Sequence, residues 1–184
     1  VPAKTRAWDC ATGNGQIASV LAESFTEVYA TDISASQLSY APKKSNIHYS
    51  EQQAEKVNFP DRFFNLITVG QAIHWFEFKR FYTEVKRTAL PGGILAVIGY
   101  GLAETDDDIN LIIKKFYSDI VGKYWDKERV YIDEQYRTIP FPFDEIAAPE
   151  FQIQTEWTLQ ELKGFFATWS AVQHFIDQEG FDPV

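Results

Sequence analysis

The sequence contains no methionine, and its first residue is Val1. Because translation begins with methionine, we expect residue 1 not to be the natural start of the protein. A single cysteine, Cys10, excludes a disulfide bond within the chain. Free thiols are typical of reducing compartments, and we therefore predict a cytoplasmic location.

Basic residues are also scarce. Lys and Arg number 17 against 26 Asp and Glu, which gives a net charge of −9. This charge argues against a broad phosphate-binding surface, so we do not expect a nucleic-acid partner. No apolar run approaches the roughly 18 residues that a membrane span requires, and no signal-peptide pattern opens the sequence. We therefore expect no membrane partner either, while the composition leaves the oligomeric state open.

Apolar runs alternate with helical stripes through the first hundred residues. The runs expected to form strands are 5–10, 28–31, 46–50, 63–70 and 94–98. The stripes expected to form helices are 16–24, 34–40 and 78–90. This alternation predicts an α/β fold with a doubly wound, mostly parallel sheet and helices on both faces. Ligands of such sheets bind beyond the carboxyl ends of the strands. The strand ends to search are therefore 9–15, 32–33, 52–56 and 70–75.

The pattern changes after residue 101. The stretch Phe116–Phe143 is rich in aromatic residues, which could line an apolar pocket or form the underside of a lid. Apolar and polar residues alternate over 150–157, which predicts a strand. Helices are expected at 107–121, 158–167 and 168–178. We therefore divide one domain into a core, 1–101, and a helical, lid-like C-terminal part, 102–184.

The segment Gly13–Ala18 matches the pattern Gly-x-Gly-x-x-Ala. Glycine allows a tight turn and a close approach of a ligand, and the following helix N-terminus exposes unpaired N–H groups. Asp32, at the end of the next strand, could accept hydrogen bonds from ribose hydroxyls. The segment could hold a dinucleotide or S-adenosylmethionine, or simply join strand to helix. Asp9 favours S-adenosylmethionine, because a carboxylate repels a pyrophosphate and attracts an ammonium or a sulfonium.

Four ordered motifs resemble those of class I S-adenosylmethionine-dependent methyltransferases, in the branch of the type 11 and trans-aconitate methyltransferase-like proteins. They are Trp8–Gly15, Ala30–Ser34, Gln53–Glu55 with Phe59–Asp61, and Gly70–Phe76. Phe141–Phe143 and Thr168–Gln173 extend the resemblance. The sequence departs from the family pattern where Ala11 replaces the first glycine and Gln53 replaces an acidic residue.

The resemblance implies S-adenosyl-L-methionine as cofactor and S-adenosyl-L-homocysteine as product. The loop glycines would cradle the methionine part, Asp32 would bind both ribose hydroxyls, and Ile33 would pack on adenine. Gln53 would read the adenine edge, and Gln71 would lie near the methionine or the methyl group. The expected cofactor-binding residues are Asp9, Ala11, Thr12, Gly13, Gly15, Asp32, Ile33, Gln53, Ala54 and Gln71.

The sheet of this family usually has the strand order 3-2-1-4-5-7-6, with strand seven antiparallel. The segment 150–157 is the candidate for strand six, and no candidate for strand seven precedes Val184. Helices that normally precede strand one are absent as well. We therefore expect a Rossmann-like methyltransferase fold that is incomplete at both ends.

The resemblance implies an enzyme that transfers a methyl group to a small-molecule acceptor by in-line displacement. Positioning and desolvation can supply most of the acceleration of such a reaction. His74 is the candidate catalytic residue, as a general base, or else a hydrogen-bonding wall of the pocket. Trp75 is a second candidate for the acceptor pocket, or else a packing residue. A carboxylate acceptor would need cationic partners, for which Arg80, Arg87, Arg129 and Arg137 are available.

Two other functions stay open at this point. No Cys/His cluster has the spacing of metal ligands, so we expect no metal. The loop pattern is also compatible with an NAD(P)-dependent oxidoreductase. A non-catalytic module that binds the cofactor would carry the same motifs.

Overall fold

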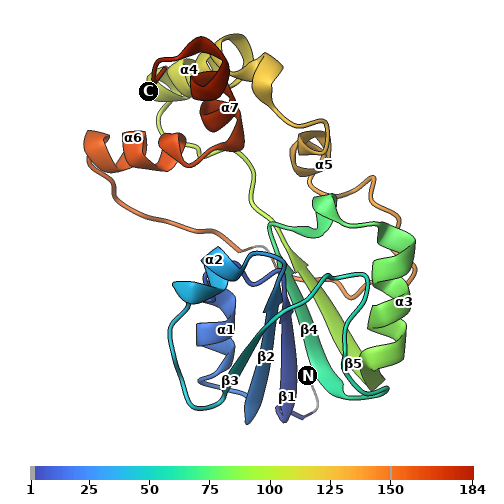
Figure 1. Ribbon diagram of the computed structural model, residues 1–184. Helices are drawn as coiled ribbons and strands as arrows, with labels where there is room; N and C mark the ends of the chain where they lie inside the picture. Colours follow the sequence, from blue (N-terminus) through green and yellow to red (C-terminus); the bar gives the residue numbers. More distant parts are fainter. Residues whose placement is uncertain (1–2, 150) are drawn as a thin grey trace. The chain divides into compact units, whose positions relative to one another are not determined.

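The computed structural model describes residues 3–149 and 151–184 (Figure 1). The chain divides into two compact units. The first comprises residues 3–100 together with Glu134–Pro142, and the second comprises Gly101–Asp133 together with 143–149 and 151–184. The sequence-based division at residue 101 places Glu134–Pro142 with the C-terminal part. This segment instead packs within the first unit.

The first unit is built on a parallel sheet. Its strands are β1 (Arg6–Cys10), β2 (Glu27–Asp32), β3 (Ile47–Glu51), β4 (Phe64–Gly70) and β5 (Ala89–Ile98). They lie in the order β3-β2-β1-β4-β5, and every neighbouring pair is parallel. This confirms the doubly wound sheet that the alternation predicts. The winding reverses at β1, whose neighbours are β2 and β4, so the carboxyl ends of these strands frame a site typical of the fold.

Helices cover both faces of this sheet, as predicted. They are α1 (Gln16–Leu21), α2 (Ala35–Ser39), the 3₁₀ turn η1 (Ile73–Trp75) and α3 (Phe78–Thr88). Successive residues of β1 point to opposite faces. Ala7 belongs to a buried cluster with Ala18 of α1, whereas the Trp8 ring contacts Phe81 of α3. Figure 1 shows α1 and α2 beside β1–β3 and α3 beside β4 and β5.

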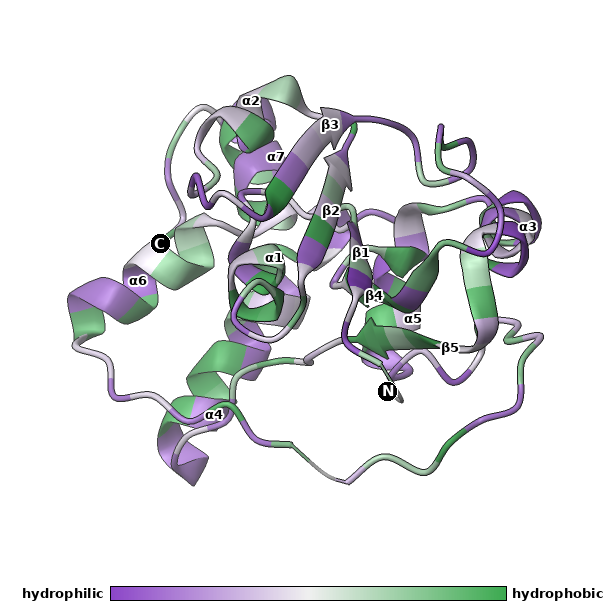
Figure 2. Ribbon diagram, turned by 90° about the horizontal axis from the view of Figure 1, so that it is seen from below, coloured by the Kyte–Doolittle hydropathy of each residue, from purple (hydrophilic) through white to green (hydrophobic). Residues whose placement is uncertain are grey.

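Side-chain caps explain where two of these helices begin. The Ser34 side chain accepts a hydrogen bond from the Gln37 N–H at the start of α2, and the Glu77 side chain accepts one from the Lys79 N–H at the start of α3. Each cap satisfies an N–H group that has no partner within the helix. In Figure 2, α3 carries both hydrophilic and hydrophobic colours, as expected for a helix with one buried face.

The last strand begins earlier than expected. The sequence predicts a turn at Pro91–Gly93 and a strand over 94–98, whereas β5 already begins at Ala89, which pairs with Phe64. The next pair is Ile94 with Leu66, so the extra residues form a bulge. A β-carbon at Gly93 would come within 2.9 Å of the Leu90 carbonyl oxygen, which explains a glycine at this place.

The second unit is helical. Its elements are α4 (Asp107–Lys115), a π-helical turn η2 (Phe116–Ile120), η3 (Gly122–Tyr124), α5 (Arg129–Asp133), α6 (Leu159–Ala167) and α7 (Ser170–Glu179). The predicted helices over 158–167 and 168–178 are confirmed. The unit has its own core around Val121, Phe166 and Trp169, against which Phe116 and Trp125 pack. Aromatic residues from the first half of Phe116–Phe143 therefore build this core.

The strand predicted over 150–157 does not form in the part of this segment that the structure describes. Residues 151–157 are irregular, and residue 150 lies outside the described residues. Phe151 is 83% exposed and Ile153 is almost equally exposed. A strand needs a neighbour to pair its backbone groups, and none of the described strands lies in that role. Alternating hydrophobicity alone was therefore misleading here.

Candidate functional site

The loop between β1 and α1 contains three residues with left-handed backbone conformations. They are Ala11, Gly13 and Gly15, with φ values of 54°, 56° and 82°. The N–H of Gly15 donates to the Thr12 carbonyl over 2.9 Å, which closes the turn immediately before α1. A β-carbon at Gly13 would meet no atom closer than 4.0 Å, so glycine is needed there for its backbone conformation rather than for crowding by the chain. A side chain would instead fill the space above the loop.

Asp9 lies behind this loop. Its side chain is 1% exposed. One carboxylate oxygen accepts from the Thr12 hydroxyl and from the Ala18 N–H at 3.0 Å, and the other accepts from the Thr68 hydroxyl at 2.7 Å. Burial raises the pKa of Asp9, while these hydrogen bonds partly oppose the rise. The carboxylate thus ties the loop, α1 and β4 together.

Asp32 meets the same loop from the end of β2. Its two carboxylate oxygens accept hydrogen bonds from the Gly13 N–H at 2.8 Å and from the Ser34 N–H at 2.9 Å. The next residue, Ile33, is 72% exposed, although a large apolar side chain is usually buried. The structure therefore brings the expected glycine and the expected carboxylate together, with an apolar surface beside them.

The segment after β3 lies beside Asp32. The Gln52 N–H donates to the Asp32 carbonyl oxygen over 3.0 Å, and Gln53 forms an isolated antiparallel bridge with Lys56. Gln53 is exposed, whereas Ala54 is buried. The expected adenine-reading residues thus follow directly on the strand that neighbours Asp32.

The end of β4 carries the remaining expected residues. Gln71 has φ 51°, and its backbone N–H donates to the Ile98 carbonyl over 2.8 Å. A β-carbon at Gly70 would lie 2.3 Å from Ile17 Cδ1, so the glycine lets α1 approach the strand end. His74 is only 6% exposed, and Trp75 is 54% exposed with its ring centroid 4.9 Å from that of His74. Trp75 is therefore not buried by packing.

Tyr136 joins this group although no sequence motif marked it. Its hydroxyl lies 3.0 Å from His74 Nδ1 and 3.2 Å from Gln71 Oε1. Its ring lies against Gly99, where a β-carbon would come within 2.6 Å of it. The aromatic richness of its surroundings was the only available signal, and that signal does not single out one tyrosine.

Arg87 does not take part in this site. It donates to the backbone carbonyls of Phe59 and Val57 and pairs with Glu84 and Asp61 at 2.7 and 2.9 Å. Hydrogen bonding to Glu84 is the main cause that raises the pKa of Arg87. This arginine therefore fastens the segment before β4 to α3, and it is not a candidate partner for an acceptor.

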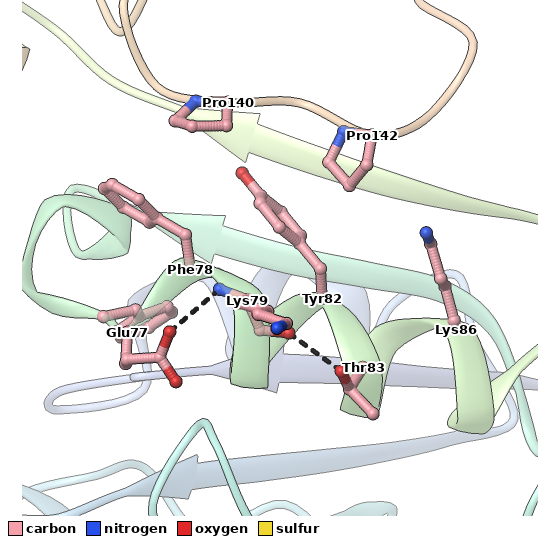
Figure 3. A pocket seen from close by; sticks show the side chains of 9 residues that line it. Glu77, Phe78, Lys79, Tyr82, Thr83, Lys86, Pro140 and Pro142 are labelled. Carbon is pink, nitrogen blue, oxygen red and sulfur yellow. Dashed lines mark hydrogen bonds between the residues drawn. The ribbon is translucent and has the colours of Figure 1, made fainter.

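A groove of about 750 Å³ runs along α3 (Figure 3). It is lined by Phe76, Glu77, Phe78, Lys79, Tyr82, Thr83, Lys86, Pro140 and Pro142. Figure 3 shows the Tyr82 side chain directed toward Pro140 and Pro142. Burial raises the pKa of Tyr82 to about 12. None of the expected site residues lines this groove.

The described residues provide neither a metal-binding cluster nor a membrane-spanning helix. Among residues 3–149 and 151–184, no group of three or more His, Cys, Asp and Glu side chains is placed to hold a metal ion. Nor does any helix of these residues combine the length and apolarity needed to cross a membrane.

The chain is similar in sequence and in structure to known methyltransferases. A profile described as "Methyltransferase domain" matches residues 8–97. The solved structure of a "Putative Type II Methyltransferase" from Anaeromyxobacter dehalogenans is 35% identical in sequence and superposes with a TM-score of 0.90. The similarity covers 99% of this chain and 77% of that one.

For two curated relatives, the similarity covers a smaller share of the relative's own length than it does for this solved structure. A "Putative methyltransferase" from Dictyostelium discoideum is 33% identical over 171 residues, which cover 91% of this chain and 65% of that protein. A demethylmenaquinone methyltransferase from Chlorobaculum tepidum is 34% identical over 112 residues, which cover 59% of this chain and 44% of that protein. The parallel sheet, the loop that meets Asp32 and these similarities agree, and the chain belongs to the S-adenosylmethionine-dependent methyltransferase family.

Proposed function

We propose that this chain binds S-adenosyl-L-methionine and transfers its methyl group to a small-molecule acceptor, releasing S-adenosyl-L-homocysteine. The observation that carries the proposal is the meeting of Gly13 and Asp32 beside the exposed side chain of Ile33. These three residues offer a backbone cradle, a hydrogen-bond acceptor and an apolar face, which a nucleoside joined to an amino acid requires.

The chemistry of each group fits this ligand. A carboxylate has about four lone-pair sites and the Asp32 carboxylate uses two for backbone N–H groups, so two remain for ribose hydroxyls. Ile33 would cover one face of adenine, and Gln53 with the Ala54 N–H would read its edge. The backbone of Ala11, Gly13 and Gly15, with Thr12, would hold the methionine part.

Charge favours this ligand over a dinucleotide. The segments 9–16 and 70–76 contain no lysine or arginine, and the Asp9 and Asp32 carboxylates lie at or behind the loop. A pyrophosphate would meet uncompensated negative charge there, whereas an ammonium and a sulfonium would be attracted. The same reasoning makes an NAD(P)-dependent oxidoreductase the weaker candidate.

The cofactor supplies a methyl group that is activated by its sulfonium. The chain's own residues would orient the acceptor and exclude water, which are the main contributions to an in-line displacement. Gln71 would lie next to the methionine or the methyl group, and the exposed Trp75 would form a wall of the acceptor pocket. His74 would accept a hydrogen bond or a proton from an acceptor that carries one.

Composition supports the acceptor class and the location. The net charge of −9 disfavours nucleic acid, and the strand-end sequence Gly70–Trp75 lacks the Asn-Pro-Pro-Tyr pattern of enzymes that methylate base or amide nitrogens. A small-molecule acceptor is therefore favoured. The single cysteine supports a cytoplasmic location.

Calorimetry tests the proposal directly. S-adenosylhomocysteine and NAD are titrated separately into the chain, and we expect saturable binding of the first only. Binding of NAD alone would favour the oxidoreductase, and binding of neither would contradict the proposal. A methyl-transfer assay over a panel of small acceptors, run where cofactor binding is measured, then separates an enzyme from a non-catalytic binding module.

A further inference from the structure

We propose that Tyr136 is a positioning residue that holds neutral His74 in its Nδ1–H tautomer, so that Nε2 carries the lone pair. The inference concerns how the proposed site would handle an acceptor proton, and it therefore rests on the proposed function. It depends on four groups that lie in one hydrogen-bonded row, namely the Tyr100 carbonyl, the Gln71 amide, the Tyr136 hydroxyl and the His74 imidazole.

The row has a fixed starting point. The Tyr100 carbonyl oxygen can only accept, and Gln71 Nε2 lies 2.8 Å from it as the donor. The amide orientation that this bond requires turns Gln71 Oε1 toward the Tyr136 hydroxyl, 3.2 Å away. Because a carbonyl oxygen can only accept, the hydroxyl proton of Tyr136 points to Gln71.

The remaining bond follows from the first two. A tyrosine hydroxyl has one proton, and Gln71 receives it, so the oxygen meets His74 Nδ1 with its lone pair over 3.0 Å. Nδ1 must then carry a proton. In the neutral imidazole this leaves the lone pair on Nε2.

Reversing the donor and acceptor roles along this row is unfavourable, whether the change is made at Tyr136 or at Gln71. If Tyr136 donated to His74, Gln71 Oε1 would face a hydroxyl oxygen that offers it no proton. If the Gln71 amide were flipped to supply a donor, its oxygen would face the Tyr100 carbonyl oxygen instead. Either arrangement places two acceptors against each other in a partly buried row, where a lost hydrogen bond costs stability.

The backbone holds these side chains in place. Gln71 has φ 51°, and Gln135 and Tyr136 have φ 55° and 60°, conformations that non-glycine residues seldom adopt. The Tyr136 ring is stacked on the His74 ring at 5.9 Å with an interplanar angle of 24°. Local strain of this kind persists where the surrounding contacts over-determine it, which is common at functional sites.

The tautomer matters for an acceptor that carries an O–H or N–H proton. As the acceptor atom forms its bond to the methyl carbon, the carbon–sulfur bond breaks and its electron pair stays on sulfur. The acceptor proton moves to His74 Nε2, and the resulting imidazolium keeps its Nδ1–H bond to Tyr136. An Nε2–H tautomer would present a proton instead of a lone pair and could not take part in this way.

Nitrogen NMR of the chain labelled with ¹⁵N-histidine tests the proposal. The chain has three histidines, so the assignment is tractable. His174 serves as an internal reference, because its Nδ1 lies 2.9 Å from the Tyr124 carbonyl oxygen and must donate to it. At a pH where the imidazoles are neutral, we expect His74 to show the Nδ1–H pattern, as His174 does. An Nε2–H pattern for His74 in the unmodified chain would overturn the proposal.

Variants of Tyr136 and Gln71 then test whether these residues set the His74 tautomer. Tyr136→Phe keeps the ring and removes the hydroxyl, and Gln71→Leu removes the acceptor that takes the tyrosine proton. We expect both to shift His74 toward the Nε2–H tautomer. Tyr40→Phe, at an exposed tyrosine of the same unit, is the matched control and should change nothing. An unchanged His74 pattern in folded Tyr136→Phe would overturn the role of Tyr136.

Calorimetry with S-adenosylhomocysteine on the same samples separates this inference from the proposed function. We expect Tyr136→Phe to change the affinity by less than about 2-fold, because the hydroxyl bonds His74 and Gln71 rather than the loop. Absence of binding by the unmodified chain would contradict the proposed function and leave the tautomer measurement valid. If the unmodified chain binds S-adenosylhomocysteine and Tyr136→Phe does not, Tyr136 also supports cofactor binding. That result would overturn the proposal that its role is limited to positioning His74.

Discussion

The backbone N–H of Gly13 and the carboxylate of Asp32 are hydrogen bonded over 2.8 Å, although 19 residues separate them in the chain. The bond joins the loop after β1 to the end of β2. It presets the carboxylate next to the loop that would hold the cofactor, so the two halves of the proposed binding site do not have to come together on binding.

Replacing this carboxylate should weaken cofactor binding. In Asp32→Asn the charge is lost, and the amide nitrogen would face one of the two backbone N–H groups that the carboxylate now accepts. We expect S-adenosylhomocysteine to bind roughly 10- to 100-fold more weakly by calorimetry, because charge-assisted hydrogen bonds are the strong ones. Asp108→Asn, an exposed change of the same charge in the second unit, should stay within about 2-fold. Equal affinities of the two variants would contradict the assignment.

Gly99 and Gly101 provide a matched pair. A β-carbon at Gly99 would come within 2.6 Å of the Tyr136 ring, whereas one at Gly101 would meet no atom within 4 Å. We expect Gly99→Ala to lower the free energy of unfolding by about 1–3 kcal/mol, since the ring must move. Gly101→Ala should be neutral or slightly stabilising. Urea denaturation measures both, and similar midpoints would show that the Tyr136 ring is not held where the structure has it.

Titration of the buried Asp9 should make the free energy of unfolding depend on pH. Burial raises the pKa of Asp9 in the folded state above its unfolded value. The folded state therefore binds this proton more tightly, and the associated stability is fully present below the unfolded pKa and lost as pH rises through the folded pKa.

Asp9→Asn tests this sign. The variant cannot titrate, so its free energy of unfolding should lack the decrease that the unmodified chain shows from about pH 4 upward. At pH 7 the variant should be less stable by about 1–3 kcal/mol, because the amide nitrogen would meet the Ala18 N–H or a threonine hydroxyl that now donates to the carboxylate. Urea denaturation across pH 4–7 measures both effects. Parallel pH profiles for the two proteins would contradict the role of Asp9.

Cys10 should resist thiol reagents while the chain is folded. The residue is fully buried, and this burial raises its pKa well above the ordinary value, with the nearby Asp9 carboxylate adding to the rise. Little thiolate forms, and the reagent cannot reach it. We expect iodoacetamide at pH 8 to modify the intact chain at least about 10-fold more slowly than the urea-unfolded chain. Because the chain has one cysteine, mass spectrometry reads the result directly, and equal rates would contradict the burial.

Much of the first unit could be predicted from local sequence. Apolar runs such as 63–70 and the pattern Gly13–Ala18 depend on backbone periodicity and on the conformations that glycine allows, and both are properties of neighbouring residues. The same holds for Asp32, because the end of a parallel strand has a known place at the edge of the sheet. These features identified the five strands and the loop that would hold the cofactor.

Other features depend on contacts between distant residues. The alternation over 151–157 did not produce a strand in the described residues, because a strand requires a partner that periodicity cannot supply. The bulge in β5 depends on the register against β4.

The sequence by itself determined the parallel sheet, the glycine loop and the carboxylate that faces it, because each follows from short-range pattern and strand order. Only the tertiary structure decided that Asp9 holds the loop from behind and that Tyr136 reaches His74 across 62 residues of chain. The reason is physical. A hydrogen bond has a direction and a length, and both are set by where folded segments meet rather than by which residues stand next to each other in the chain.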